Sequence, residues 1–289
     1  MDSGDSTGVS PATAFALLGH EHRVDILHAL LDANQHSVET PIPFSKLFAR
    51  TEIAVSSQFS YHLEELTGQF IRDTGDGYEL RYAGWKVATA ILAGTYNEHA
   101  SFGPTSVTGT CPNCGMEMLV AVYESEWLAI SCRDCDTRHI RYPIPPGAVQ
   151  SRSVPALLEA FDRYVRSHMA RARDGVCPAC LGVMEIKTDP DDNDTLATGV
   201  CQRCGNRLYP PVGLFFRDHE RVTWFRHEYE TDRLTVPFWE LNWCVTDDAV
   251  EVTGTDPWQC RLEIAAEEAS LVLLLGDGLA VHSTTIENA

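Results

Sequence analysis

Eight of the ten cysteines in this chain form four Cys-x-x-Cys pairs, and these pairs fall into two sets of similar span. Residues 115–131 separate the pairs of the first set, and residues 181–200 separate those of the second. Four thiolates at such a spacing suit one tetrahedral Zn²⁺, as in a structural zinc ribbon. We therefore predict two Zn²⁺ per chain. The predicted ligands are Cys111, Cys114, Cys132 and Cys135 in the first set, and Cys177, Cys180, Cys201 and Cys204 in the second.

Two other interpretations of the cysteine pairs stay open at this point, a disulfide framework and a redox switch. Glycine follows two of the pairs directly, at Gly115 and Gly205, and follows a third one residue later, at Gly182. Glycine in such a place lets the backbone turn its N–H groups towards sulfur and so stabilises thiolate charge. This detail favours metal binding.

The length of 289 residues suits about two domains. The 44% share of apolar residues is enough for hydrophobic cores, but no apolar run reaches the length of about 18 residues that a membrane span needs. The opening residues MDSGDSTGVS are acidic and polar, unlike a signal peptide. We therefore expect a cytoplasmic protein with reduced cysteines and no membrane partner.

The charge balance is strongly acidic, with 41 acidic residues against 22 basic ones and a net charge of −19. Lysine is scarce and occurs only as Lys46, Lys86 and Lys187. An acidic excess with little lysine resembles the proteins of halophiles that keep molar potassium in their cytosol. The alternative is an ordinary acidic protein that avoids nucleic acid.

The N-terminal region has the pattern of a small helical domain with a hairpin. Apolar spacing predicts helices over 13–31, 44–51 and 56–68, with Ser56 or Ser57 as the cap of the third. Asp76-Gly77 predicts a hairpin turn between two short strands, and a helix is expected over 83–96. This order of elements is that of a winged helix-turn-helix.

Three stretches of this region resemble the ArsR-type winged-helix regulators of haloarchaea. ALLGHEHRVDILHAL is similar to their first helix, SSQFSYHLEEL to their recognition helix, and GDGYELRYAGWKVATAI to their wing and following helix. The resemblance covers roughly residues 12–96. It implies a DNA-binding domain that acts as a homodimer on double-stranded DNA. The region contains no cysteine, so the metal sensing of that family is not carried over.

In this fold the recognition helix reads base edges while flanking basic residues contact phosphates. Residues 1–100 hold only six Lys and Arg against 13 acids, whereas an ordinary DNA-binding domain is positively charged. A winged helix used for protein contact is therefore the alternative. The expected phosphate contacts are Lys46, Arg50, Arg72 and Arg81, and the expected groove-facing residues are Ser56, Ser57, Gln58, Ser60 and Tyr61.

Beyond residue 96 the pattern changes several times. Residues 97–110 have the composition of a linker, each cysteine set encloses two strand-like stretches, and 141–152 is a proline-rich joint. Apolar residues at helical spacing predict a connecting helix capped by Ser153. Residues 189–194 are expected to form an acidic solvated turn, because they lack the glycine and the terminal glutamate of a calcium loop. From residue 211 we expect helices and then a β-meander.

The predicted fold class is α+β: an N-terminal winged helix-turn-helix, two four-cysteine zinc ribbons joined by a helix, and a C-terminal helix plus antiparallel β-meander. No catalytic motif is present, so we expect a transcriptional regulator and not an enzyme. The rival is an adaptor resembling archaeal transcription factor E, which contacts the transcription machinery. The expected segments are a disordered tail (1–12), winged helix (13–97), first ribbon (108–145), connecting helix (153–174), second ribbon (175–210) and C-terminal unit (211–289).

Overall fold

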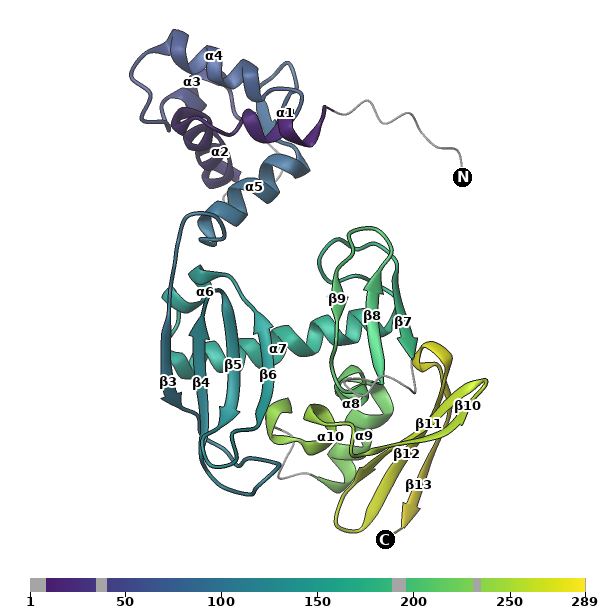
Figure 1. Cartoon of the computed structure of the whole chain (residues 1–289). Coiled ribbons are helices and arrows are strands. Elements are labelled where there is room, and N and C mark those ends of the chain that lie inside the picture. The colour runs from purple at the N-terminus through teal and green to yellow at the C-terminus, as the bar shows by residue number, and fades with distance from the viewer. Residues whose placement is uncertain (1–8, 35–40, 189–195, 231–234, 289) are drawn as a thin grey trace. The chain divides into compact units, whose positions relative to one another are not determined.

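The computed structural model describes residues 9–34, 41–188, 196–230 and 235–288. These form two compact units, Met1–Glu98 and His99–Ala289, which are described separately below (Figure 1). Both units combine α-helices with antiparallel strands, so the α+β class predicted from the sequence is confirmed. Among the described residues, no helix has the length and apolar character needed to cross a membrane.

The first unit contains five helices and one β-hairpin in its described part. Its helices are α1 (Pro11–Ala16), α2 (Glu21–Asn34), α3 (Phe44–Phe48), α4 (Ser56–Leu66) and α5 (Tyr82–Leu92). The hairpin strands β1 (Ile71–Asp73) and β2 (Tyr78–Leu80) pair antiparallel, with Ile71 opposite Leu80. Fully buried apolar residues from every helix except α1 meet the hairpin in one core, which includes Ile26, Leu47, Phe59, Ile71 and Ala88.

The single helix predicted over 13–31 is wrong, because the chain turns between α1 and α2. The Ser10 hydroxyl accepts a hydrogen bond from Thr13 N–H and Pro11 opens α1, so this helix starts inside the stretch predicted as a disordered tail. The chain leaves the helix at Leu17 and passes Gly19. His20 Nδ1 then accepts from His22 N–H and caps the start of α2. Residues 1–8 of the predicted tail lie outside the described residues.

The third predicted helix is present as α4, but its cap differs from the prediction. Val55 occupies the cap position and no side chain bonds to the free N–H groups there, so neither Ser56 nor Ser57 caps the helix. The predicted hairpin is present, with Gly77 at its turn. A Cβ atom on Gly77 would lie 2.7 Å from the backbone of Ile42, which pairs with Tyr78 beside the hairpin. Glycine is needed at this close approach.

The second unit begins with a four-stranded antiparallel sheet in the order β3-β4-β5-β6 (Figure 1). Its strands are β3 (Phe102–Ser106), β4 (Leu119–Glu124), β5 (Trp127–Cys132) and β6 (Arg138–Pro143). The prediction that 97–110 is only a linker is wrong for β3, which forms the edge of this sheet. Gly103-Pro104 sits at an irregularity in the pairing of β3 with β4, where the missing proline N–H is tolerated.

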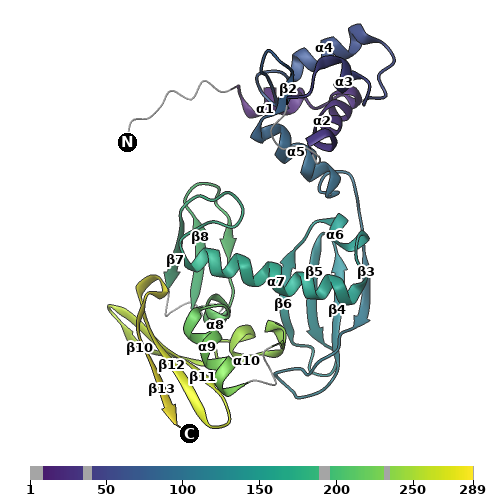
Figure 2. The same ribbon diagram turned by 180° about the vertical axis from the view of Figure 1, so that it is seen from behind.

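After β6 come the short α6 (Pro146–Gln150) and the long α7 (Val154–Arg173). Ser153 holds the cap position of α7, as predicted, although its side chain makes no capping hydrogen bond. The apolar stripe of α7 is buried at Leu157, Phe161, Val165 and Met169. Figures 1 and 2 show α7 running from the β3–β6 sheet towards the next sheet, so this helix connects the two cysteine-bearing segments.

The second cysteine set belongs to a three-stranded sheet of β7 (Met184–Thr188), β8 (Ala197–Cys201) and β9 (Arg207–Leu208). The acidic turn predicted at 189–194 lies outside the described residues. The single long helix expected after residue 211 is interrupted, giving α8 (Val212–Phe216) and α9 (Glu220–Tyr229). The break is at His219, whose side chain caps α9 by accepting from Arg221 N–H.

Two short turns of helix, η2 (Phe238–Glu240) and α10 (Asn242–Val245), lead to the C-terminal sheet. That sheet is the predicted β-meander, with β10 (Val250–Thr255), β11 (Trp258–Ala265), β12 (Ala269–Gly276) and β13 (Val281–Asn288) paired in chain order; η3 (Asp277–Leu279) joins the last two. One continuous hydrophobic core runs from the first sheet through α7 to this meander. Cys244 and Cys260, the two cysteines outside the Cys-x-x-Cys pairs, are buried in that core.

Candidate metal centres and nucleic-acid surface

The four sulfurs of the first cysteine set converge between the start of β4 and the start of β6. The Sγ atoms of Cys111 and Cys135 lie 3.8 Å apart, and those of Cys114 and Cys132 lie 3.7 Å apart. All four ligand atoms lie within 4.8 Å of one another. Tetrahedral Zn–S bonds of about 2.3 Å require sulfur–sulfur separations of about 3.8 Å, so this arrangement has the size of a zinc site.

The second set repeats this geometry around the ends of β7 and β8. Cys177 and Cys204 have Sγ atoms 3.8 Å apart, and Cys180 and Cys201 have theirs 3.6 Å apart. Cys201 is the last residue of β8, just as Cys132 is the last residue of β5. In each sheet, the second Cys-x-x-Cys pair therefore begins at the end of a strand. A disulfide needs sulfurs about 2.05 Å apart, and all eight cysteines carry free thiols in this structure. The separations fit shared metal ions and do not fit disulfides.

Each Cys-x-x-Cys turn ends in a residue with left-handed backbone. In two turns this residue is glycine, Gly115 (φ 75°) and Gly205 (φ 72°), and in the other two it is Asp136 (φ 56°) and Leu181 (φ 61°). The displaced glycine of the third turn, Gly182, therefore does not supply the left-handed step. Its N–H instead lies 3.4 Å from Cys180 Sγ, and a Cβ atom there would meet Arg203 at 2.7 Å.

Polar side chains within and beside the cysteine turns surround the first cluster. Asn113 donates its amide N–H to Cys135 Sγ at 3.4 Å, and the Thr137 hydroxyl lies 3.3 Å from the same sulfur. Hydrogen bonds from Thr137 and then from Asn113 lower the pKa of Cys135 to about 6. One ligand of this cluster is therefore disposed to be a thiolate near neutral pH, which is the form that binds metal.

A buried histidine, His139, completes the surroundings of the first cluster. Its Nε2 lies 3.3 Å from Cys111 Sγ, and burial lowers the pKa of this imidazole. A neutral imidazole that donates Nε2–H to the sulfur would stabilise thiolate charge without becoming a fifth ligand. The position of His139 carries no signal in the sequence, because 28 positions separate it from Cys111 and only the pairing of the strands brings the two together.

The second cluster relies on backbone N–H groups. Those of Cys204 and Arg203 both point at Cys201 Sγ at 3.4 Å, and they lower the pKa of Cys201 to about 6. Asn206 occupies the position that corresponds to Thr137, and its amide nitrogen lies 4.0 Å from Cys177 Sγ. Both clusters thus present four sulfurs and one lowered thiol pKa. Two metal ions fit them, and a four-sulfur shell leaves no open position for substrate.

The nine predicted DNA-contacting residues all lie on the first unit and are solvent-exposed. Ser56, Ser57, Gln58, Ser60 and Tyr61 occupy the outer face of α4, while Phe59, His62, Leu63 and Leu66 face the core. Tyr61 is about half exposed, at 53%. The polar face also carries Glu64, an acid that the sequence analysis did not weigh.

The predicted phosphate-contacting residues are placed less uniformly. Lys46 lies on α3, whereas Arg50 lies beyond it, because the expected helix over 44–51 tightens into turns after Phe48. Arg81 is the cap residue of α5. Two of the arginines already have carboxylate partners, Arg50 with Asp32 at 3.0 Å and Arg72 with Glu79 across the hairpin.

A cluster of histidines lies against the inner side of α4. The rings of His20 and His22 are 4.1 and 5.3 Å from that of His62, centroid to centroid. Arg23 donates to His62 Nδ1 at 3.4 Å and pairs with Glu65 at 3.1 Å, so α2 is joined to α4 by polar contacts. Burial lowers the pKa of His62, and so do the charges of His20, Arg23 and His22. The charge of Glu65 opposes this shift without cancelling it.

Comparisons with known protein families match two segments of this chain. Residues 11–91, which hold the helices and the hairpin of the first unit, match the family model described as a domain of unknown function, DUF7347. Residues 108–281, which hold both cysteine clusters, match a second model, described as a domain of unknown function, DUF7351. No curated protein and no solved structure matches the chain. Because the second match covers more than half of the sequence, the chain belongs to the DUF7351 family.

Proposed function

We propose that this protein is a sequence-specific DNA-binding transcriptional regulator whose second unit is held together by two zinc ions. The observation that supports DNA binding is the exposed polar face of α4, followed by a two-stranded hairpin. A helix with that face can enter the major groove while a hairpin reaches the adjacent backbone, which is how a winged helix-turn-helix binds. The resemblance of this unit to ArsR-type regulators points the same way.

Zinc is the proposed metal for both clusters because four sulfurs at about 3.8 Å suit its size and its preference for thiolate. The proposed role is structural, since a closed shell of four sulfurs offers no open position. Elemental analysis of protein purified without added metal should find two zinc ions per chain. A protein with no zinc and no titratable thiols would contradict this proposal.

A homodimer is proposed because α5 carries an apolar stripe on its solvent side. Tyr82, Trp85 and Leu92 are exposed and follow a spacing of three and seven residues, which places them along one face of the helix. The same stripe on a second copy would complement it about a two-fold axis. Trp85→Glu should therefore turn a dimer into a monomer in sedimentation equilibrium, whereas Lys46→Glu, at an exposed position on α3, should leave the mass unchanged.

The proposed separation between base-contacting and phosphate-contacting residues can be tested one residue at a time. Gln58 can pair with the edge of adenine, so Gln58→Ala should cost about 1–3 kcal/mol on the preferred site and much less on other DNA. Arg81→Ala should weaken binding to all sequences alike, because a phosphate contact carries no base information. Affinities would be measured by fluorescence anisotropy on a site selected from random DNA. An unchanged site preference in Gln58→Ala would rule out α4 as the reader.

One observation favours the second candidate function, an adaptor that contacts the transcription machinery. The carboxylates of Asp32 and Glu79 already pair with Arg50 and Arg72, so these arginines offer little free charge to phosphate. Asp32→Asn and Glu79→Gln separate the two functions. A DNA-binding unit should bind DNA more tightly once these acids are removed, whereas an adaptor should show no DNA affinity in either form and should co-purify with RNA polymerase.

A further inference from the structure

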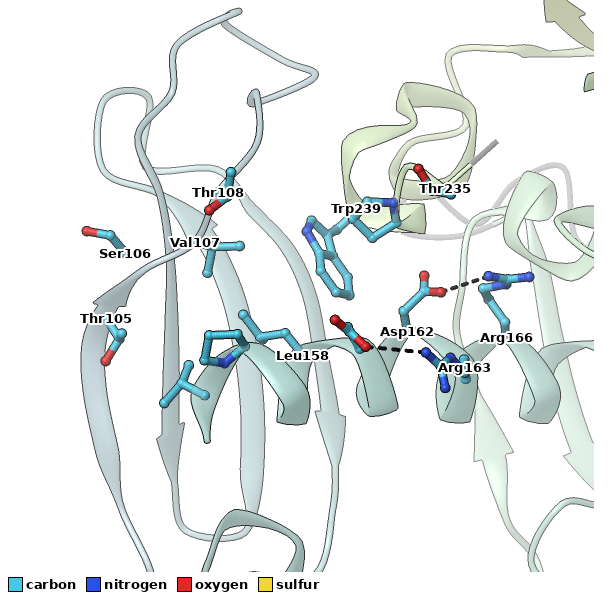
Figure 3. A pocket seen from close by; sticks show the side chains of 14 residues that line it. Thr105, Ser106, Val107, Thr108, Leu158, Asp162, Arg163, Arg166, Thr235 and Trp239 are labelled. Carbon is cyan, nitrogen blue, oxygen red and sulfur yellow. Dashed lines mark hydrogen bonds and ion pairs between the residues drawn. The ribbon is translucent and has the colours of Figure 1, made fainter. Parts of the chain in front are cut away.

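The second unit contains a cavity of about 590 Å³ that neither the metal centres nor the DNA surface uses. Three segments form its walls: residues 105–108 at the end of β3, one face of the first three turns of α7, and residues 235–239 (Figure 3). Cavities of this size commonly hold small organic molecules. All three walls belong to one compact unit.

One side of the cavity is apolar and includes an indole ring. Val107 and Leu158 are buried in the core, and Pro237 and Trp239 close the opposite wall. Figure 3 shows the Trp239 indole lying between the strand side, at Val107, and the α7 side, at Leu158. An aromatic or branched hydrocarbon body would pack well against such a wall.

The polar groups at the cavity include hydroxyls that can adapt to a ligand. Those of Thr105 and Thr235 are not engaged in side-chain hydrogen bonds within the described part of the chain. Trp239 is 3% exposed and its indole nitrogen is itself buried, so this residue lines the cavity with its ring and not with its N–H.

The charged groups divide into one closed network and one loose pair. The buried Asp162 accepts from Arg166 at 2.7 Å, as Figure 3 shows, and from Phe238 N–H at 3.0 Å; Arg166 also binds Asp218. Both Asp162 and Arg166 therefore already have partners within the protein. Among the described residues, Arg163 by contrast meets only Glu159, at 3.4 Å, and both side chains are more than 70% exposed. Such a pair is weak and readily exchanged, which leaves Arg163 as the available cation.

The helix that carries Arg163 adds to the positive potential. The 20-residue α7 begins at Val154 beside the cavity, and its first turn contains no acidic residue. The partial positive charge of a helix N-terminus therefore faces this region without a neutralising side chain.

We propose that this cavity binds a small monocarboxylic acid with an aromatic or branched apolar body. The carboxylate takes the place of Glu159 at Arg163, and the apolar body packs on Trp239, Val107 and Leu158. This ligand site goes beyond the proposed DNA-binding function, and its test needs no DNA.

The experiment is isothermal titration calorimetry on the full-length, zinc-loaded chain. The probes are benzoate, phenylacetate, 3-phenylpropionate and indole-3-acetate, and phenylacetamide is the neutral analogue. We expect saturable binding with a Kd below about 1 mM for at least one acid, and binding of phenylacetamide at least about fivefold weaker than that of phenylacetate.

Variants assign the site and keep the test independent of misfolding. Arg163→Ala should weaken the acid at least about fivefold, whereas Glu159→Gln should tighten it by removing the competing carboxylate. Because Arg163 also borders a second, apolar hollow beside Tyr164, Trp239→Phe is needed as well, and it should weaken binding at this cavity alone. Arg171→Ala, on the same helix outside both hollows, is the matched control.

The proposal is overturned if none of the four acids binds saturably up to about 10 mM, a concentration that would reveal even weak affinity. It is also overturned if phenylacetamide binds as well as phenylacetate, or if Glu159→Gln weakens binding of the acid, since that result would show that Glu159 does not compete with the ligand carboxylate for Arg163. Acid binding that is lost in Arg163→Ala but untouched in Trp239→Phe would move the site to the hollow beside Tyr164 and refute this assignment.

Discussion

Metal removal should unfold the whole second unit and leave the first unit folded. The buried cysteines Cys111 and Cys177 belong to the same continuous core as α7 and the C-terminal meander, so neither cluster is an independent module. A four-cysteine zinc site contributes apparent binding energy of about 10–16 kcal/mol, which is also folding energy. The total stability of a domain is about 5–15 kcal/mol. Losing even one ion should therefore exceed what this unit can tolerate.

The six tryptophans make this prediction measurable, because only Trp85 lies in the first unit. Trp239 and Trp258 are each 3% exposed and Trp243 is also buried, so unfolding of the second unit should shift the emission strongly to the red. The assay titrates a strong chelator while emission and far-ultraviolet circular dichroism are recorded. The helical signal of α2, α4 and α5 should survive the treatment. Concentrated potassium chloride is kept constant so that repulsion among the acids is screened.

Cys132→Ser and Cys260→Ala form the matched pair for this experiment, since both cysteines are buried but only Cys132 belongs to a four-cysteine cluster. Cys260→Ala should lower the melting temperature by a few degrees, at about 2–4 °C per kcal/mol for a unit of this size. Cys132→Ser should abolish the cooperative transition of the second unit. A chelated protein that keeps its blue emission and melts within a few degrees of the loaded form would refute the reasoning.

Three further predictions concern pH, a buried carboxylate and salt. The pKa of His62 is lowered in the folded state, so its contribution to stability is lost as pH falls below about 6.5, the pKa of histidine in the unfolded chain. His62→Gln should flatten the dependence of stability on pH, measured by urea unfolding of the first unit at several pH values. Asp162→Ala leaves Phe238 N–H unpaired and should destabilise the second unit by about 2–4 kcal/mol in denaturant unfolding, against less than about 1 kcal/mol for the exposed Asp174→Ala. Because the protein has a net charge of −19, its affinity for a selected DNA site should change little, or increase, as the potassium chloride concentration rises. A steep loss of affinity, like that of basic regulators, would contradict the halophilic interpretation.

Sequence patterns predict those elements whose burial follows a simple period. The meander is the clearest case, because β11 alternates buried and more exposed residues along its whole length. The α7 stripe is equally regular. By contrast, β3 contains Gly103-Pro104, which is typical of a linker, and it becomes a strand only through its distant partner β4. The break after α1 depends on a local cap at His20 that competes with a continuous helical pattern.

The candidate metal ligands could be taken from the sequence because they lie in short, regular motifs. Their supporting residues are harder to predict. Thr137 contacts Cys135 from only two positions away, but His139 reaches the sulfur of Cys111 only after strand pairing fixes the register of β5 and β6. The cavity beside Trp239 was equally inaccessible to sequence reasoning. Its walls come from three segments that are distant in the chain, and only the folded structure brings them together.

The left-handed residues that end the four cysteine turns suggest an order in which the ligands are released. Glycine adopts this conformation freely at Gly115 and Gly205, and aspartate tolerates it at Asp136, but at Leu181 it costs about 1–2 kcal/mol. The turn that holds Cys177 and Cys180 is therefore the strained one; Cys180 and Cys204 are both solvent-exposed, so the strain decides between the two pairs. Competing thiols or oxidants should open the second cluster from this side first, while Cys201 and Cys204 keep hold of the ion.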